Sequence, residues 1–277
     1  MARYKRENIN ENLNLNVRGL SQSATLAINE RSNELIKKGR EVFKLGLGQS
    51  PFPVPSTVVE ALKKNAHQKD YLPVKGLLPL REAIAGFNKR VNKLGCFTFP
   101  SSLRWLLNAI SIVASETFTS TSAPIQYAAI KAFEENKEID IYLPKTRAIL
   151  KGIAKYMVNQ LRNMHIKVPM PQGAFYLFLD FEFYRENFIR NGIYTSVEMC
   201  KKLLDETGVA ILPGSDFGRQ PEELTARLAY VDFDGKKAIN ALTDQKNGNN
   251  IDEEFIKKYC PKLVQAIFMI KEWLSKL

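Results

Sequence analysis

Hydrophobic positions recur at helical spacing over much of the chain. The segment SATLAINERSNELIKKG, residues 23–39, predicts a helix that ends at Gly39, a residue suited to a left-handed C-terminal turn. The same type of pattern predicts further helices in the first half of the chain, at 78–95, 102–116 and 123–136. Pro124 suits the first turn of the last of these, and Gly95 suits the end of the first.

Extended apolar segments are few and lie mostly late in the chain. They predict strands at 41–49, 96–100, 173–181, 209–214 and 224–233. Only the segment CFTFP, at 96–100, falls between residues 50 and 172. A single short strand cannot cover the apolar stripes of the helices around it, as a parallel sheet would. The pattern therefore predicts a helix-rich α/β protein whose sheet is reduced in the middle of the chain.

Two capping boxes mark expected helix starts. Thr57 and Glu60 predict a helix that runs to about His67. Thr195 and Glu198 predict a second one, which Gly208 ends.

Composition narrows the class of protein. With 277 residues, of which 45% are apolar, the chain is long enough to bury a sizeable core. The start MARYKREN lacks the apolar core of a signal peptide, and no apolar run reaches the ~20 residues that span a bilayer. The cysteines and histidines are sparse and far apart: Cys96, Cys200, Cys260, His67 and His165. We therefore expect reduced thiols, a cytoplasmic protein, no metal site and no membrane partner.

The chain carries 40 Lys and Arg against 29 Asp and Glu, a net charge of +11. Nucleic-acid binding is one interpretation of such an excess. The basic residues are scattered singly and in pairs, with no basic run and no interleaved aromatic platform. The sequence thus favours no nucleic-acid partner and a modest preference for small anionic molecules.

Six segments in order resemble the class I/II, fold-type I aminotransferases, the pyridoxal phosphate (PLP) enzymes typified by aspartate aminotransferase. The segments are SATLAINERSNELIKKGREVFKLGLGQSPFPVP, KDYLPVKGLLPLREAIAGF, FTFPSSLRWLLNAISIVASETFTSTSAPIQYAA, MPQGAFYLFLDF, GVAILPGSDFG and ARLAYV. The resemblance implies a PLP-transferase-like α/β fold with a retained small α+β domain, at 1–49 and 140–277, and a truncated large domain at 50–139.

One part of the family pattern is absent. In the family a long segment separates the counterpart of REAIAGFNKRV from that of FTFPSSL, whereas here Cys96 follows Gly95 and leads directly into Phe97. The absent segment would carry the phosphate loop, the Asp that pairs with the ring nitrogen and the lysine that binds PLP covalently. Lys276, in a predicted terminal helix, is in the wrong place. We therefore expect an internal deletion with its junction near 94–99, no catalytic residue, and no transamination by this chain alone.

Three residues match family binding positions. Arg227 corresponds to the arginine that binds the substrate carboxylate through two hydrogen bonds. Gly48 corresponds to a glycine whose backbone lies against that carboxylate. Tyr71 corresponds to a tyrosine that reaches the PLP phosphate of the other subunit. Without the family, Arg227 reads as an edge-strand surface arginine, Gly48 as a turn glycine with positive φ, and Tyr71 as a loop tyrosine beside Pro73.

Other family matches have simpler interpretations. In the loop 120–124, Ser122 is suited to an ordinary helix N-cap. The two glycines of PGSDFG, at 213–218, predict a turn. The resemblance implies that this turn shapes the small domain near the substrate entrance and does not hold the PLP phosphate.

Several functions stay open at this point. The resemblance implies an aminotransferase, with PLP as cofactor and amino acids and 2-oxo acids as substrates, acting as a homodimer. A second hypothesis is a non-catalytic partner that forms a heterodimer with a full-length sibling. A third is an unstable truncated variant, because helices without their sheet expose apolar stripes.

Overall fold

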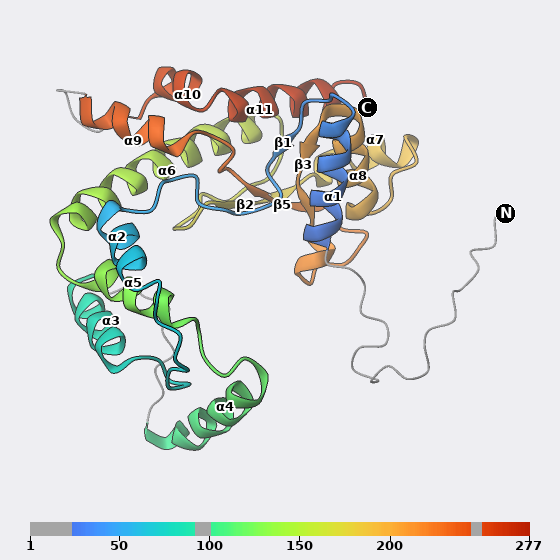
Figure 1. Ribbon diagram of the computed structural model, residues 1–277. Helices are drawn as coiled ribbons and strands as arrows, with labels where there is room; N and C mark the ends of the chain where they lie inside the picture. Colours follow the sequence, from blue (N-terminus) through green and yellow to red (C-terminus); the bar gives the residue numbers. More distant parts are fainter. Residues whose placement is uncertain (1–23, 92–100, 245–250) are drawn as a thin grey trace. The chain divides into compact units, whose positions relative to one another are not determined.

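The computed structural model describes residues 24–91, 101–244 and 251–277 (Figure 1). The predicted strand at 96–100 and the expected junction near 94–99 lie outside the described residues. The chain divides into two compact units. Unit 1 comprises the residues up to Pro51, Leu150–Ala238 and Asn250–Leu277, and unit 2 comprises Phe52–Ile149 and Ile239–Asn249.

These units follow spatial contacts, whereas the predicted domains, at 1–49 with 140–277 and at 50–139, followed the family's order of segments. The division falls inside a long helix, at Leu150. We keep the identification of unit 1 with the family's small domain as a prediction.

Unit 1 contains the strands of the described chain. Its strands are β1 (Phe43–Lys44), β2 (Tyr176–Asp180), β3 (Val209–Ala210), β4 (Leu212–Pro213) and β5 (Thr225–Ala229). Its helices are α1 (Ala24–Lys37), the second part of α6 (Lys137–Asn163), α7 (Arg185–Arg190), α8 (Ser196–Thr207), the start of α9 (Gly235–Asp244), α10 (Glu253–Tyr259) and α11 (Pro261–Leu274), with the short turns η2 (Glu182–Tyr184) and η3 (Gly214–Phe217).

Two small sheets organise this unit. β1 and β3 pair in parallel, with Phe43 opposite Val209. The other sheet is antiparallel in the order β2-β5-β4, so β5 is its central strand. The strands predicted within 41–49, 173–181, 209–214 and 224–233 are confirmed, although the first shrinks to two residues.

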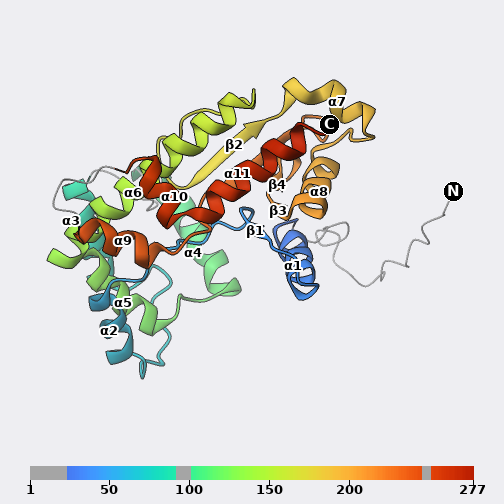
Figure 2. The ribbon, with the colours of Figure 1, turned by 90° about the horizontal axis from the view of Figure 1, so that it is seen from above.

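The core of unit 1 forms between these strands and the helices α8 and α11. α8 contacts β3, β4, β5 and α11, and α11 contacts β1 and β3 (Figure 2). The apolar side chains at these contacts are almost completely buried, among them Met199, Leu203, Val209, Leu228, Leu263 and Ile270. Removal of this apolar surface from water is the main source of stability for the unit.

Both predicted ends of α8 are confirmed. The Thr195 hydroxyl accepts a hydrogen bond from the Glu198 N–H at 3.2 Å, and the Glu198 carboxylate accepts one from the Thr195 N–H at 3.0 Å. Gly208 follows the helix with φ of +79°. Gly39 likewise follows α1 with φ of +77°.

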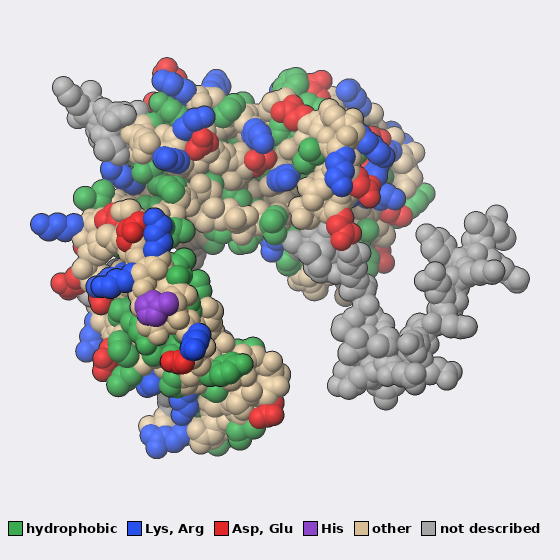
Figure 3. Space-filling view, in the orientation of Figure 1, with side chains coloured by type: hydrophobic (Ala, Val, Ile, Leu, Met, Phe, Trp, Pro, Cys, Tyr) green, Lys and Arg blue, Asp and Glu red, His purple; other side chains and the backbone are tan. Residues whose placement is uncertain are grey.

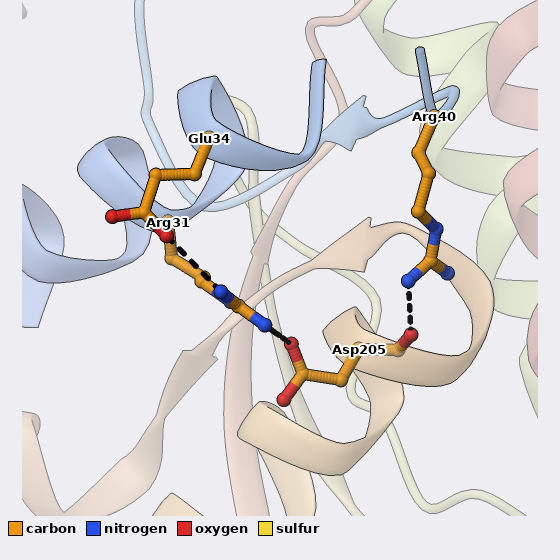
Figure 4. A network of polar contacts seen from close by, with 4 residues as sticks. All are labelled: Arg31, Glu34, Arg40 and Asp205. Carbon is orange, nitrogen blue, oxygen red and sulfur yellow. Dashed lines mark hydrogen bonds and ion pairs between the residues drawn. The ribbon is translucent and has the colours of Figure 1, made fainter. Parts of the chain in front are cut away.

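A polar network joins α1 to the last turn of α8 (Figure 4). The Arg31 guanidinium donates to the Asp205 carboxylate at 2.8 Å and to Glu34 at 3.0 Å. Arg40 donates to the backbone carbonyl of Asp205 at 2.6 Å. Positive charges at the carboxyl end of a helix interact favourably with the helix dipole. The bonds from Arg31 and Arg40 hold α1 and the segment before β1 against the last turn of α8.

Unit 2 contains helices and loops and no strand among its described residues. It contains α2 (Ser56–Lys64), α3 (Leu78–Val91), η1 (Ser101–Leu103), α4 (Arg104–Thr117), α5 (Ala123–Phe133), the first part of α6 and the second part of α9. α5 packs against α2 and α3, and the Phe87 and Phe133 rings meet at 5.6 Å. The predicted helices are confirmed, with Pro124 in the first turn of α5 and Ser122 at its N-cap position, although the Ser122 side chain makes no capping bond.

The predicted capping box of Thr57 and Glu60 is wrong. α2 begins at Ser56, one residue before Thr57, and its N-cap, Pro55, has no side-chain oxygen to accept a bond. The Glu138 carboxylate accepts the Ser56 N–H at 2.7 Å and the Thr57 N–H at 3.1 Å instead. A carboxylate distant in sequence thus satisfies the free N–H groups that a local cap would have taken.

Glu138→Gln is expected to lower the stability of unit 2 by about 1 kcal/mol at neutral pH, because a charged acceptor at a helix N-terminus is lost. Hydrogen bonds from the Thr57 and Ser56 N–H groups lower the pKa of Glu138 from 4.5 to about 2. The stabilisation is therefore present above about pH 4.5 and lost as the pH falls toward 2. Urea unfolding at several pH values measures this difference.

The matched control is Glu60→Gln, because Glu60 lies on α2 itself but, among the described residues, pairs with Lys63 alone, at 2.8 Å on the surface. This variant should differ from the wild type by less than about 0.5 kcal/mol at every pH. An equal, pH-independent loss in both variants would contradict the role given to Glu138.

Candidate functional site

Arg227 lies in the middle of unit 1. It belongs to β5, the central strand of the antiparallel sheet, and its side chain is half-buried. The interpretation of Arg227 as an edge-strand surface residue is therefore wrong. Its Cα lies opposite Phe178 of β2 and Leu212 of β4.

The Arg227 guanidinium lies close to two aromatic rings. Its Cζ atom is 4.5 Å from the centre of the Tyr176 ring and 4.4 Å from that of Phe217. Tyr176 comes from β2 and Phe217 from η3, which follows β4, so the rings belong to the segments on either side of β5. Both distances are within the range of cation–π attraction.

The polar contacts of this guanidinium are incomplete. Nη2 donates to the backbone carbonyl of Gly46 at 3.1 Å, while Nε is buried and has no hydrogen-bond partner among the described residues. A buried donor without a partner is unfavourable, and each such group calls for an explanation. Nε and Nη2 together can hold a carboxylate by two parallel hydrogen bonds. The arrangement suits an anionic ligand with a planar carboxylate.

The positive charge of Arg227 is not neutralised by an ion pair with any described residue. Desolvation raises the pKa of the Asp216 carboxyl group, and the charge of Arg227 opposes that rise. Arg227 thus supplies a local positive field that an anionic ligand would meet.

Gly48 lies close to Tyr176. A Cβ atom on Gly48 would stand 1.9 Å from the Tyr176 hydroxyl oxygen and 2.4 Å from Cζ. Gly48 is not among the described glycines with positive φ. The interpretation of Gly48 as a turn glycine with positive φ is therefore wrong, and its contact with the substrate carboxylate stays a prediction.

Tyr71 lies in unit 2, in the loop between α2 and α3, and its side chain is 88% exposed. This position agrees with an ordinary loop tyrosine. The predicted reach of Tyr71 to a PLP phosphate stays a prediction.

The residues around Arg227 do not fit PLP itself. The groups that contact the guanidinium in the described part of the chain are a backbone carbonyl and two aromatic rings, and none is an amine that could bind the cofactor covalently. Lys276 follows the end of α11 at Leu274, so it lies in a turn and not in the terminal helix as expected. The contacts of Arg227 suit a carboxylate ligand.

Tyr176 and Phe217 were not predicted as site residues. The strand predicted at 224–233 contains Arg227, but the residues of β2 and η3 that lie beside Arg227 follow from the strand pairing. The available signal was aromatic residues in two segments that also resemble the family, GAFYLFLDF and PGSDFG. Alternation in the first puts Tyr176 and Phe178 on one face.

His, Cys, Asp and Glu side chains form no cluster able to hold a metal ion in the described ranges. Within those ranges, no helix combines the length and apolar character needed to cross a bilayer.

Sequence comparison relates the chain to aminotransferases. A profile of the family described as aminotransferase class I and II matches residues 91–232, just over half of the chain. An aspartate aminotransferase of Thermotoga maritima is 32% identical over 135 residues, which are 48% of this chain and 31% of that protein. An asparagine–oxo-acid transaminase of Streptococcus mutans is 30% identical over 142 residues, 50% of this chain and 33% of that protein. The chain thus spans about a third of the length of these relatives.

Structure comparison gives the same fold. The aspartate aminotransferase structure from Thermotoga maritima superposes with a TM-score of 0.66 at 16% identity, covering 95% of this chain and 100% of that one. The Thermus thermophilus aspartate aminotransferase with maleate superposes with a TM-score of 0.69 at 15% identity, covering 94% of this chain and 99% of that one. The fold is therefore that of the fold-type I aminotransferases, in a helix-rich form with a small sheet.

Proposed function

Since the chain belongs to the class I and II aminotransferase family, we propose that it is a carboxylate-binding member of this family that does not transaminate by itself. The observation that carries this proposal is the Arg227 guanidinium, whose buried Nε has no partner among the described residues. The ligands that suit it are amino acids and 2-oxo acids, the substrate classes of the family. PLP is the cofactor that the family implies.

The sequence supports the proposed loss of transamination activity. Transamination needs a lysine amine to hold the cofactor and move a proton, and an acid opposite the ring nitrogen. The family segment expected to carry this lysine and this acid has no counterpart in the sequence, where Cys96 alone separates Gly95 from Phe97. The partial coverage of the curated relatives agrees with such an internal deletion.

Carboxylate binding is tested by calorimetric titration with maleate, the ligand named for the Thermus thermophilus structure. Arg227→Met is expected to weaken binding at least ten-fold, because a charge-assisted two-pronged hydrogen bond is lost. Arg190→Met is the matched control, since Arg190 lies exposed at the end of α7 and should leave affinity unchanged. Equal affinities in the wild type and Arg227→Met would refute the proposal.

Loss of the cofactor site is tested separately. The purified chain is incubated with PLP, reduced with borohydride, and digested for mass spectrometry. We expect no lysine to be modified stoichiometrically. A single fully modified lysine, together with turnover above a control containing PLP alone, would show that another lysine has taken over the role and would overturn the proposed inactivity.

A second candidate function is that of a partner for a full-length sibling. The observation that favours it is α4, in unit 2, where Ala114 is the single buried residue. Large apolar side chains on or next to this helix are exposed: Trp105 by 65%, Ile112 by 65%, Val113 by 63% and Phe118 by 63%. Figure 3 shows hydrophobic side chains at the surface of this unit. Exposed apolar patches of this kind are typical of protein interfaces.

Co-expression with a full-length sibling and size-exclusion chromatography test this second function. Co-elution as a heterodimer is the expected result if α4 is an interface. Separate elution of the two chains would exclude it. The same experiment on the chain alone tests whether it forms a homodimer.

A further inference from the structure

We propose that Tyr176, together with Phe217, forms an aromatic clamp that positions the Arg227 guanidinium, and that residue 48 must be glycine to admit the Tyr176 ring. This inference deepens the proposed function and rests on it, since the clamp serves the carboxylate site. It assigns a positioning role to Tyr176 and a new reason for Gly48. The clamp is defined here as the Tyr176 and Phe217 rings.

The Arg227 guanidinium is held by one hydrogen bond and two ring contacts among the described residues. An arginine side chain has many rotamers, and holding one of them costs entropy. The single hydrogen bond from Nη2 to the Gly46 carbonyl, at 3.1 Å, fixes only one point of the group. The two rings, at 4.5 Å and 4.4 Å from Cζ, restrict the group further and leave its edge for hydrogen bonds.

The Nε atom of Arg227 is a buried donor without a hydrogen-bond partner among the described residues. Burial of Nε without a partner is unfavourable and would drive the side chain to rotate toward water if nothing held it. The clamp opposes this rotation. The guanidinium is thus held in one position before any ligand arrives, which reduces the entropy lost on binding.

The position of the Tyr176 ring explains why residue 48 is a glycine. Its φ is not in the left-handed region, so the backbone conformation alone does not demand glycine. The atoms that a Cβ would meet first all belong to the end of the Tyr176 ring, at 1.9 Å for the hydroxyl oxygen, 2.4 Å for Cζ and 2.6 Å for Cε1. An alanine at position 48 would therefore move the ring that contacts Arg227.

A double-mutant cycle tests the link between the two residues without any ligand. Gly48→Ala should lower the Tm of the wild type, because the Tyr176 ring must move. In the Tyr176→Ala background the same change should leave the Tm unaltered, because the obstructing ring is gone. An equal fall in both backgrounds would overturn the proposal, since Gly48 would then be required for another reason.

Labelling with phenylglyoxal, which modifies arginine, tests the positioning of Arg227 directly. Peptide mass spectrometry should show slow modification of Arg227 relative to the exposed Arg190 in the wild type. Tyr176→Ala should increase the Arg227 rate about ten-fold, as the loss of a desolvated cation–π contact implies. Tyr176→Phe retains the ring and should keep the slow rate. An unchanged rate in Tyr176→Ala would overturn the positioning role.

These readouts separate the two proposals. Failure of maleate to bind the wild type would count against the carboxylate-binding function alone. The cycle and the labelling rates would still report whether the clamp holds Arg227 and why residue 48 is glycine. Where maleate binds, Tyr176→Ala should weaken it about ten-fold and Tyr176→Phe by less than about two-fold.

Discussion

Gly208→Ala is expected to destabilise unit 1 by about 3 kcal/mol, one of the two largest effects predicted for this protein. Gly208 has φ of +79°, which an alanine adopts only at a cost of about 1 to 2 kcal/mol. A Cβ atom would also stand 2.3 Å from the backbone carbonyl oxygen of Glu41. Because that atom belongs to the backbone just before β1, the chain there must move to relieve the contact.

The movement would break a specific hydrogen bond. The Phe43 N–H donates to the Gly208 carbonyl at 2.9 Å, next to the pairing of Phe43 with Val209. Urea unfolding should show the loss of stability, and hydrogen exchange should show faster exchange at Phe43. A Tm lower by roughly 6 to 12 °C is the corresponding thermal result.

Gly218→Ala is the matched control for this prediction. Gly218 also has φ of +79°, but nothing lies within 4 Å of a Cβ atom there. The control therefore carries the backbone cost alone and should lose about 1 kcal/mol. Equal losses in the two variants would show that the contact with Glu41 carries no cost.

The sequence predicted those features whose partners are close along the chain. The capping box of Thr195 and Glu198 spans three residues, and Gly208 ends the same helix, so both ends of α8 followed from local chemistry. The box of Thr57 and Glu60 had the same local signal and failed. The Glu138 carboxylate, 82 residues from Ser56, accepts hydrogen bonds from the Ser56 and Thr57 N–H groups. No pattern of neighbouring residues indicates a partner so distant in sequence.

The candidate site shows the same limit. The apolar pattern predicted a strand at 224–233 that contains Arg227, but only the order β2-β5-β4 shows that this strand is central. Tyr176 and Phe217 are 51 and 10 residues away from Arg227 in sequence, so their contact with it depends on the sheet's register. The reason that residue 48 is a glycine depends on the position of the Tyr176 ring, so the sequence alone could not predict it.

The placement of the site bears on the proposed function. The groups that surround Arg227, from Gly46, Tyr176 and Phe217, all belong to unit 1. None comes from the part of the chain near 94–99, where the family pattern is interrupted. The groups proposed to bind a carboxylate therefore lie outside the region where the family pattern is interrupted, which supports the proposal of a chain that binds a ligand without converting it.

That proposal requires a stably folded unit 1, and Phe188→Ala tests its core most severely. Phe188, on α7, is completely buried, and its ring lies 6.4 Å from that of Phe181 and 5.5 Å from that of Trp273. Truncation of a buried phenylalanine removes apolar contacts and leaves a cavity. The expected loss is about 3 to 5 kcal/mol.

Tryptophan fluorescence during urea unfolding measures this loss in the right unit. The chain has two tryptophans, of which Trp105 is 65% exposed and Trp273 only 4% exposed. The emission of Trp105 changes little on unfolding because it is already in water, so the signal reports Trp273 and its contact with Phe188. Phe183→Ala is the matched control, since Phe183 is 61% exposed and should lose less than about 1 kcal/mol. Equal losses from Phe183 and Phe188, or no cooperative transition in the wild type, would show that unit 1 lacks the packed core on which the Arg227 site depends.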